Sequence, residues 1–331
     1  MKKVRVAING FGRIGRVFLR SSFLNSQIEI VAINDLADSK TLAHLLKYDS
    51  VHRAFPGEVA HDSEGLFVNG KHIRILNHKD PSLLPWKELD IDIVIESTGL
   101  FIDKLSAQKH IEAGAKKVIL SAPPKDDTKT IVMGINDHLV TKEDIILSNA
   151  SCTTNCAAPM VKVLQKWGIE DAYISTVHSY TGDQRLHDAP HKDLRRARAA
   201  AMSIVPTSTG AAKAITRIFP ELDGKVGGGG IRVPVPDGSL TDITCILKEK
   251  PTAEEINAEF KRASENELKG ILAYTEDPVV STDIIGNPYS CLFDAEFTSI
   301  VGNMVKVIGW YDNEMGYSNR LKDLVIKLNN M

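Results

Sequence analysis

The sequence has few cysteines, almost no net charge and no long apolar run. Only four of its 331 residues are cysteines, and no two form a Cys-x-x-Cys pair, so a disulfide framework and a paired-cysteine metal site are not expected. The 40 basic and 42 acidic side chains leave a net charge of −2, too weak to mark a nucleic-acid or membrane-surface binder. No apolar stretch approaches the length of a membrane-spanning helix, and the first residues do not resemble a signal peptide. These absences predict a cytoplasmic protein with free thiols.

Length and composition indicate an ordinary globular protein. At about 150 residues per domain, 331 residues predict two domains. The 43% of hydrophobic and 25% of charged residues exclude a disordered or collagen-like chain. We find no internal repeat and no low-complexity linker.

Strand-like apolar runs alternate with helical patterns in the first half of the chain. This order predicts parallel strands joined by crossover helices, and therefore a doubly wound sheet that ends near residue 150. Glu64-Gly65 and Asn69-Gly70 interrupt segment 59–76, which predicts hairpins added to this sheet. The expected strands of the main sheet are 4–9, 28–34, 91–98, 117–122, 130–135 and 145–148.

The second half predicts an α+β domain. It has a helical start, a basic polar stretch at 181–198, and β-prone runs at 239–248 and 301–311. Spaced apolar residues among charges predict a surface helix over 252–267. Near the end, Leu321, Leu324, Val325 and Leu328 recur at helical spacing and predict an amphipathic helix that docks on another element.

A glycine motif near the start indicates a dinucleotide site. Gly10, Gly12 and Gly15 follow a predicted strand and open a helix, and Asp35 closes the next strand 20 residues after Gly15. Such glycines let the backbone approach a pyrophosphate, and the helix N-terminus supplies N–H donors. The carboxylate would bind ribose hydroxyls and repel a 2′-phosphate, which favours NAD over NADP. A glycine turn without a ligand is the alternative.

Cys152 is the candidate nucleophile. It follows a predicted strand and polar capping residues and precedes a helix-compatible run over 157–165, so it is expected at a helix N-terminus, where positive partial charge favours the thiolate. Most lone cysteines are simply buried small residues. Cys156, one turn further on, fits a buried neighbour better than a second nucleophile, and Pro159 is expected to kink the helix.

His178 and a group of arginines could complete a reactive centre. His178 ends a β-prone run and leads into a polar loop, so it is a candidate general base, although the other nine histidines leave a structural role open. Arg195, Arg196, Arg198 and Arg232 could hold phosphoryl groups, whereas an arginine run is more often a solvated helix face.

Seven segments together resemble the phosphorylating glyceraldehyde-3-phosphate dehydrogenases, and the likeness runs along essentially the whole chain. The family fold implied is a Rossmann NAD-binding domain over 1–151, to which a C-terminal helix over 317–331 returns, and a catalytic domain over 152–316 with a mostly antiparallel sheet. The family is usually a homotetramer. The segments are AINGFGRIGR (7–16), ASCTTNC (150–156), HSYTGDQ (178–184), LRRARAA (194–200), PTSTGAAKA (206–214), RVPVP (232–236) and WYDNEMGYS (310–318).

The resemblance implies oxidation of glyceraldehyde 3-phosphate to 1,3-bisphosphoglycerate with NAD and inorganic phosphate. Cys152 would form a thiohemiacetal and then a thioester, and His178 would be the base. Two phosphoryl groups need pockets, one from Thr181, Asp183 and Arg232, the other from Ser151, Thr153, Arg196, Thr209 and Gly210. The cofactor contacts implied are Gly10, Gly12, Arg13, Ile14, Gly15, Asp35, Lys79, Ser121, Asn313 and Tyr317, and no metal is implied.

Several positions depart from the family pattern. Lys79 stands where arginine is common and lacks its bidentate fork. Gly227 to Gly230 is a run of four glycines that predicts a locally weak strand before Arg232. Ala189-Pro190 mixes the residues typical of NAD-type and NADP-accepting relatives, so some NADP use is predicted. Met315 replaces a frequent aromatic residue, with no evident chemical consequence.

Two other functions compete with this interpretation. Erythrose-4-phosphate dehydrogenases share the fold, the cysteine and the histidine but hydrolyse the thioester with water. The threonines of HSYTGDQ and PTSTG are those expected of phosphorylating enzymes. Lys192, Arg195, Arg196 and Arg198 could also bind RNA or another anion as a secondary role, but the near-zero net charge does not favour nucleic acid as the primary partner.

Overall fold

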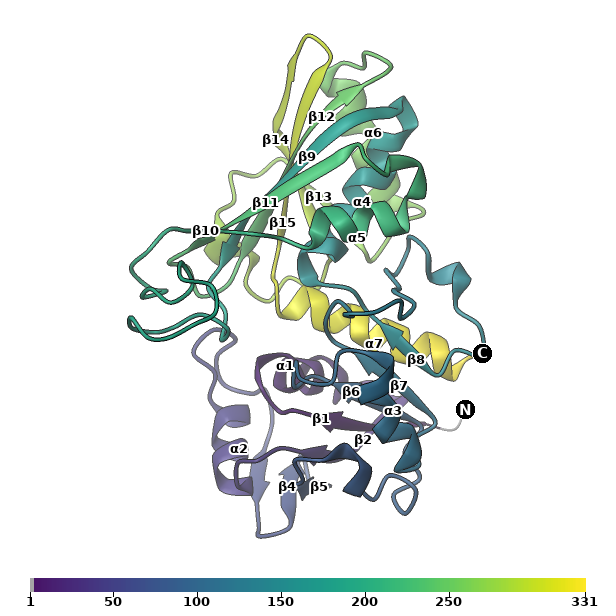
Figure 1. The fold of residues 1–331 in the computed structure, drawn as a ribbon, viewed down its shortest axis with the longest axis vertical. Helices are drawn as coiled ribbons and strands as arrows, with labels where there is room; N and C mark the ends of the chain where they lie inside the picture. The colour runs from purple at the N-terminus through teal and green to yellow at the C-terminus, as the bar shows by residue number, and fades with distance from the viewer. Residues whose placement is uncertain (1–2) are drawn as a thin grey trace. The chain divides into compact units, whose positions relative to one another are not determined.

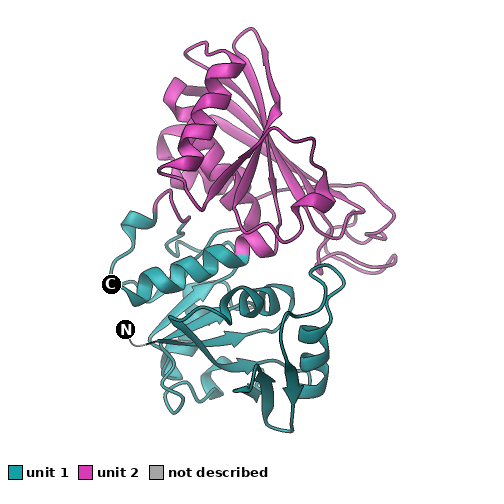
Figure 2. Ribbon diagram, turned by 180° about the vertical axis from the view of Figure 1, so that it is seen from behind, with its two compact units in different colours: residues 1–131, 137–150, 318–331 teal, residues 132–136, 151–317 magenta. Residues whose placement is uncertain are grey.

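A computed structural model describes residues 3–331, which form two compact units (Figure 2). Of the described residues, unit 1 contains 3–131, 137–150 and 318–331, and unit 2 contains 132–136 and 151–317. The chain therefore passes from unit 1 to unit 2 between residues 150 and 151 and returns to unit 1 at Ser318. No helix within residues 3–331 is long and apolar enough to cross a membrane.

Unit 1 is built on an eight-stranded sheet with the order β3-β4-β5-β2-β1-β6-β7-β8. All pairs from β5 to β8 in this order are parallel, whereas β3, β4 and β5 form antiparallel hairpins. The sheet confirms the doubly wound α/β prediction, including the added hairpins. Its strands are β1 (Val4–Asn9), β2 (Ile28–Asn34), β3 (Val59–His61), β4 (Gly65–Val68), β5 (Lys71–Leu76), β6 (Ile93–Glu96), β7 (Lys117–Leu120) and β8 (Ile146–Ser148).

The strand predicted over 130–135 is wrong. Only Thr130 forms an isolated bridge, to Ser148. The segment then turns, because the side-chain oxygen of Asn136 accepts a hydrogen bond from the backbone N–H of Val132 at 2.8 Å and Gly134 takes a positive φ of 78°. The apolar residues that suggested a strand are buried in a turn instead, as Ile131 and Val132 show.

Two of the first three helices in unit 1 begin at a side-chain cap. The three helices are α1 (Arg13–Ser22), α2 (Ser39–Lys47) and α3 (Lys104–Glu112), with short 3₁₀ turns at Pro81–Leu83 and Asp137–Leu139. Carboxylates cap two of them: Asp38 accepts from the N–H of Thr41, and Asp103 accepts from that of Ser106. Gly12 precedes α1 and offers no side-chain cap.

A buried polar network lies beneath the glycine loop of unit 1. The indole N–H of Trp86 donates to Nδ1 of His110 at 3.0 Å, so the proton of His110 is on Nε2, 3.1 Å from the Glu96 carboxylate. The other oxygen of Glu96 accepts the backbone N–H of Thr98 at 2.8 Å. The hydroxyl of Ser97 donates to the carbonyl of Gly10 at 2.7 Å. The network therefore fixes the ends of β1 and β6 that carry the loop.

Unit 2 is an α+β unit with a seven-stranded sheet in the order β10-β11-β9-β12-β15-β14-β13. The sheet is mostly antiparallel, as predicted, with parallel pairs at β11–β9 and β13–β14. Helices α4, α5 and α6 pack on one face (Figure 1). Its strands are β9 (Ile169–Ser179), β10 (Val205–Thr207), β11 (Val226–Val233), β12 (Ser239–Leu247), β13 (Leu272–Thr275), β14 (Cys291–Val301) and β15 (Met304–Tyr311).

Two of the three helices that cover the sheet of unit 2, α4 and α6, were predicted, whereas α5 was not. The three helices are α4 (Cys152–Leu164), which contains Pro159, α5 (Ala211–Ile218) and α6 (Ala253–Glu265), with 3₁₀ turns at Gln165–Trp167, Pro220–Leu222 and Ser281–Ile284. Thr252 and Glu255 form a capping box at the start of α6. The predicted C-terminal helix is α7 (Met315–Asn329), which belongs to unit 1 from Ser318 onward, and its apolar residues Leu321, Leu324, Val325 and Leu328 are buried.

Candidate active site

Unit 2 places Cys152 beside His178. Cys152 is the first residue of α4, because the hydroxyl of Ser151 accepts the N–H of Thr154 at 3.1 Å and caps the helix. His178 is the penultimate residue of β9. Its Nε2 lies 3.4 Å from the Sγ of Cys152, within reach of a sulfur hydrogen bond. Cys152 as a residue is partly exposed, whereas His178 is buried.

The surroundings of His178 assign its tautomer. Nδ1 is 2.8 Å from the carbonyl oxygen of Ser179, which can only accept, so Nδ1 carries the proton. The guanidinium Nη1 of Arg232 is 2.9 Å from the same nitrogen, but two donors form no bond, and Arg232 donates instead to the Ser179 carbonyl at 2.9 Å. Burial first, and the charge of Arg232 second, lower the pKa of His178 to about 3. The imidazole is therefore neutral, with a bare Nε2 facing the sulfur.

Burial opposes the predicted thiolate of Cys152. Burial raises the pKa of the thiol to about 11 and outweighs the charge of Arg232 and the N–H of Thr153, which act in the opposite direction. The sequence-based expectation counted the helix N-terminus and left out desolvation. Burial therefore disfavours the charged forms of both Cys152 and His178.

Strand register brings Arg232 to this pair. β11 runs parallel to β9, with Arg232 directly opposite His178. The glycine run that precedes Arg232 lies within this strand, and a Cβ on Gly228 would be 2.8 Å from the carbonyl oxygen of Ile174. Glycine there permits the close pairing of the two strands, which the sequence alone did not reveal.

The residues predicted for the two phosphate pockets are linked to one another. Arg232 donates to the hydroxyl of Thr181 at 3.1 Å, and Thr181 donates to the carboxylate of Asp183. Arg196, predicted for the other pocket, forms an ion pair with that same carboxylate. Its Nε donates to the hydroxyl of Thr207 at 3.0 Å.

Three other predicted phosphate ligands occupy helix starts. Ser151 caps α4, as described. The hydroxyl of Thr209 accepts the N–H of Ala211 at 3.2 Å, and Gly210 precedes α5 without a side-chain cap. The hydroxyl of Thr153, by contrast, is buried against the phenol of Tyr311 at 2.9 Å. Thr153 can therefore offer its backbone N–H more readily than its side chain.

The glycine loop of unit 1 has the shape that a dinucleotide needs. A Cβ on Gly10, whose φ is +92°, would lie 2.7 Å from the backbone nitrogen of Thr98, and one on Gly15 would lie 2.3 Å from the carbonyl oxygen of Gly10. Gly12 has no heavy atom within 4 Å of its Cβ position in the described chain, so its backbone is open to a ligand. With the uncapped N-terminus of α1, these glycines fit a pyrophosphate.

Asp35 lies at the same loop. Its carboxylate accepts the N–H groups of Phe11 at 2.8 Å and Ala37 at 3.0 Å, so it is fixed close to the glycines. The guanidinium of Arg13 forms a bidentate pair with Asp49 at 2.7 and 3.1 Å. The remaining predicted contacts in unit 1 are Ile14 in α1, the exposed Lys79 after β5, and Ser121 after β7.

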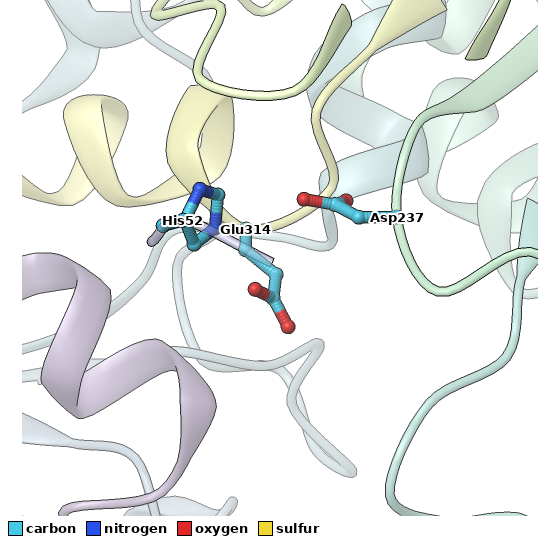
Figure 3. Close-up of side chains that lie close together, drawn as sticks. All are labelled: His52, Asp237 and Glu314. Carbon is cyan, nitrogen blue, oxygen red and sulfur yellow. The ribbon is translucent and has the colours of Figure 1, made fainter. Parts of the chain in front are cut away.

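Asn313 and Tyr317 belong to unit 2, near a buried acidic group. Asp312 accepts the N–H groups of Glu314 and Met315 and so holds the start of α7. Burial, and then the carboxylates of Asp312 and Glu314, raise the pKa of Asp237 well above its usual range (Figure 3 shows Asp237 and Glu314). A protonated Asp237 can donate a hydrogen bond, which makes this cluster of carboxyl groups compatible with burial.

Sequence reasoning missed three side chains in this part of unit 2. The hydroxyls of Ser179 and Ser239 both donate to the side-chain oxygen of Asn313. The phenol of Tyr311 contacts the hydroxyls of Thr153 and Thr176, and its ring meets the His178 ring edge-on at 5.9 Å between centroids. Ser179 and Tyr311 lie within the HSYTGDQ and WYDNEMGYS segments, but only tertiary contacts reveal their roles.

Comparison with known proteins agrees with this geometry. The family model for the glyceraldehyde 3-phosphate dehydrogenase NAD binding domain matches residues 4–104, and the model for the C-terminal domain matches residues 151–313. A glyceraldehyde-3-phosphate dehydrogenase of Geobacillus stearothermophilus is 56% identical over 324 residues, 97% of each chain. Glyceraldehyde-3-phosphate dehydrogenase 2 of Streptomyces avermitilis is 53% identical over 331 residues, 99% of each chain.

Fold, glycine loop and thiol–imidazole pair define an NAD-dependent oxidoreductase. The matched domains cover most of the sequence, and the relatives align over nearly its full length. The chain belongs to the glyceraldehyde-3-phosphate dehydrogenase family.

Proposed function

We propose that the protein oxidises glyceraldehyde 3-phosphate and captures the acyl group with inorganic phosphate, giving 1,3-bisphosphoglycerate in glycolysis or gluconeogenesis. The observation that carries this proposal is the 3.4 Å approach of His178 Nε2 to Cys152 Sγ, beside the cation of Arg232. A thiol nucleophile with an adjacent base is the arrangement needed for a thioester pathway.

Proton transfer to His178 starts the reaction. As Cys152 Sγ bonds to the aldehyde carbon, its proton passes to Nε2, which is unprotonated because the Nδ1 proton is held by the Ser179 carbonyl. The imidazolium then protonates the substrate oxygen, giving a thiohemiacetal and restoring the neutral base. The thiol thus becomes nucleophilic only as it gives up its proton, which suits a pKa raised by burial.

Oxidation and phosphate capture follow on the same sulfur. NAD, when bound, accepts the hydride of the reacting carbon. His178 takes the hydroxyl proton at this step, and a thioester to Cys152 remains. Inorganic phosphate then attacks the thioester carbon and the carbon–sulfur bond breaks; the leaving sulfur regains its proton from Nε2. The reacting carbon is oxidised by two electrons, which leave it with the hydride.

Cations and helix starts of unit 2 would hold the two phosphoryl groups. Arg232, Thr181 and Asp183 form one connected set, and Ser151, Thr153, Thr209, Gly210 and Arg196 supply hydroxyls, N–H groups and charge for the other. Arg196 bonds to Asp183, so a phosphate at either position would compete with that carboxylate for the guanidinium.

Cofactor binding is assigned to the loop of unit 1 and to unit 2 side chains. Gly10, Gly12, Gly15 and the N–H groups of Arg13 and Ile14 would hold the pyrophosphate. Asp35 would bind the adenosine ribose, Asn313 the nicotinamide carboxamide, with Tyr317 beside the ring. Lys79 and Ser121 would add further contacts, and the Arg13 side chain, engaged by Asp49, would not.

We also infer a cytoplasmic homotetramer. Support for self-association is the apolar surface of unit 2, where Leu194 and Met202 are each 82% exposed in the segment before β10. Tyr173, Ile231 and Phe297 are exposed on the strands. Light scattering of the purified chain tests this inference, and a monomer at micromolar concentration would overturn it.

The decisive experiment follows NADH formation at 340 nm from glyceraldehyde 3-phosphate and NAD, with and without inorganic phosphate. Strict dependence on phosphate is expected. Equal turnover without phosphate would mean that water resolves the thioester, as in erythrose-4-phosphate dehydrogenases. In both cases Cys152→Ser should abolish turnover, because a hydroxyl is a poor nucleophile beside a neutral imidazole; undiminished turnover would sink the proposal.

A further inference from the structure

Two buried serines hold the amide of Asn313. Ser179 Oγ donates to Asn313 Oδ1 at 2.8 Å, and Ser239 Oγ donates to the same oxygen at 2.7 Å. Ser179, Ser239 and Asn313 are at most 4% exposed. Ser239 lies at the first position of β12 and Ser179 at the last of β9, so the ends of two paired strands build this clamp.

The donors and acceptors of the clamp favour one orientation of the amide. Ser239 Oγ already accepts the backbone N–H of Ser179 at 3.1 Å, so its own proton is free to go to Asn313. If the amide were reversed, its NH₂ group would face two hydroxyls, and both hydroxyl protons would lose their acceptor on Asn313. The two bonds fill both lone pairs of Oδ1 and leave Nδ2 as the free end.

The free end of the amide is an unused donor. Within residues 3–331, no group accepts a hydrogen bond from Asn313 Nδ2, although nearly all of the side chain is buried. Nδ2 is not among the buried side-chain atoms that lack a partner, so it is the end of the amide that a ligand can reach. The group that fits is a carbonyl oxygen, whereas an N–H at that point would meet another donor.

We propose that Ser179 and Ser239 are positioning residues that hold the side-chain oxygen of Asn313 and leave its NH₂ group to bind the ligand. Asn313 can then bind only an acceptor, the carboxamide oxygen of the nicotinamide. One face of the nicotinamide ring therefore meets the reacting carbon. This inference rests on the proposed role of Asn313. Ser179 also accepts the Nδ1 proton of His178 through its carbonyl, so one residue orients both the base and the amide.

The stereochemistry of hydride transfer tests the proposal. Glyceraldehyde 3-phosphate deuterated at C1 is oxidised, and proton NMR of the NADH reports which C4 face received deuterium. The wild type is expected to label one face. The Ser179→Ala/Ser239→Ala variant is expected to label both, because its Asn313 can rotate, and to bind NAD about tenfold more weakly by titration, the loss of roughly one hydrogen bond.

Controls separate positioning from general damage. Ser290→Ala removes another serine hydroxyl of unit 2 that is 3% exposed and does not contact Asn313, and it should keep single-face labelling and wild-type affinity for NAD. In Ser179→Ala alone, Ser239 Oγ still accepts the backbone N–H of residue 179. This single variant replaces the double variant in the experiment if the double variant does not fold. It should show a smaller loss of fidelity and affinity.

Single-face labelling with unchanged NAD affinity in the serine variants would overturn the proposal. Weaker NAD binding with deuterium still confined to one C4 face would also overturn it, since that result fits a merely structural role of the two serines. Failure of the wild type to oxidise the aldehyde would instead refute the proposed function, and the NAD titrations of the variants would still test the clamp.

Discussion

Arg232 and His178 are direct neighbours across the β9–β11 pair, with Nη1 of the guanidinium 2.9 Å from Nδ1 of the imidazole. The same cation lowers the pKa of His178 and of Cys152. Arg232 therefore keeps the base neutral and makes the thiol easier to ionise, besides being a candidate substrate ligand.

Removing this cation should slow the reaction of the thiol. In Arg232→Gln, the pKa of Cys152 is expected to rise further, so less thiolate exists at any pH below it. Each unit of increase lowers the thiolate fraction about tenfold. Iodoacetamide alkylation measured from pH 7 to 10, below both pKa values, should be slower in the variant at every pH. Arg217→Gln, an exposed arginine of α5, is the control, and coincident profiles for all three proteins would contradict the prediction.

Replacing the base should separate binding from chemistry. His178→Asn retains an N–H that can reach the Ser179 carbonyl but loses the acceptor facing Cys152. We expect kcat to fall by about 10² to 10⁴-fold and alkylation at pH 7.5 to slow, with NAD affinity unchanged. His187→Asn alters an exposed histidine and should behave as wild type. An alkylation rate equal to that of wild type would show that His178 does not activate the thiol.

The charge of Asp35 should govern the choice between NAD and NADP. Asp35→Asn keeps an oxygen acceptor for the N–H of Phe11, so the glycine loop is retained while the repulsion of a 2′-phosphate disappears. The ratio of kcat/KM for NAD to that for NADP is expected to fall at least tenfold. Asp62→Asn removes a carboxylate from the β3–β4 turn and should leave the ratio unaltered. The same ratio in both variants would refute the assignment.

Stability of unit 1 should depend on the Arg13–Asp49 pair. Burial would raise the pKa of Asp49, but hydrogen bonds from Arg13 and from the N–H groups of His52 and Val51 outweigh it and lower the value to about 2. A lowered value in the fold means that the ionised form stabilises the protein above the unfolded value of about 4, and that this contribution is lost as pH falls toward 2.

Asp49→Asn should therefore lower the free energy of unfolding by about 2 kcal/mol at pH 7, the equivalent of the pKa difference. The difference from wild type should shrink between pH 4 and pH 2. Urea unfolding followed at several pH values measures it. Asp127→Asn, which removes a surface carboxylate, should cost almost nothing. A difference in the free energy of unfolding that does not change with pH would show that Asp49 stabilises the fold through its packing and not through its charge.

Local sequence patterns determined much of the fold. β1 and β2 begin and end at the predicted residues, since both are apolar runs bounded by polar or glycine residues. The glycine loop and Asp35 are close in the chain, so their spacing alone predicted a site whose parts the fold keeps together. The strand prediction for residues 130–135 was wrong because the apolar residues there are as compatible with a buried turn as with a strand.

The sequence by itself determined the two-domain α/β organisation, the dinucleotide loop and the placement of Cys152 at a helix start, because each depends on residues within a few turns of one another. Only the tertiary structure decided what surrounds them. Strand register set Arg232 against His178, burial raised the pKa of Cys152, and the ends of β9 and β12 brought two serines to Asn313. Desolvation and contacts between distant segments depend on packing, which no local pattern encodes.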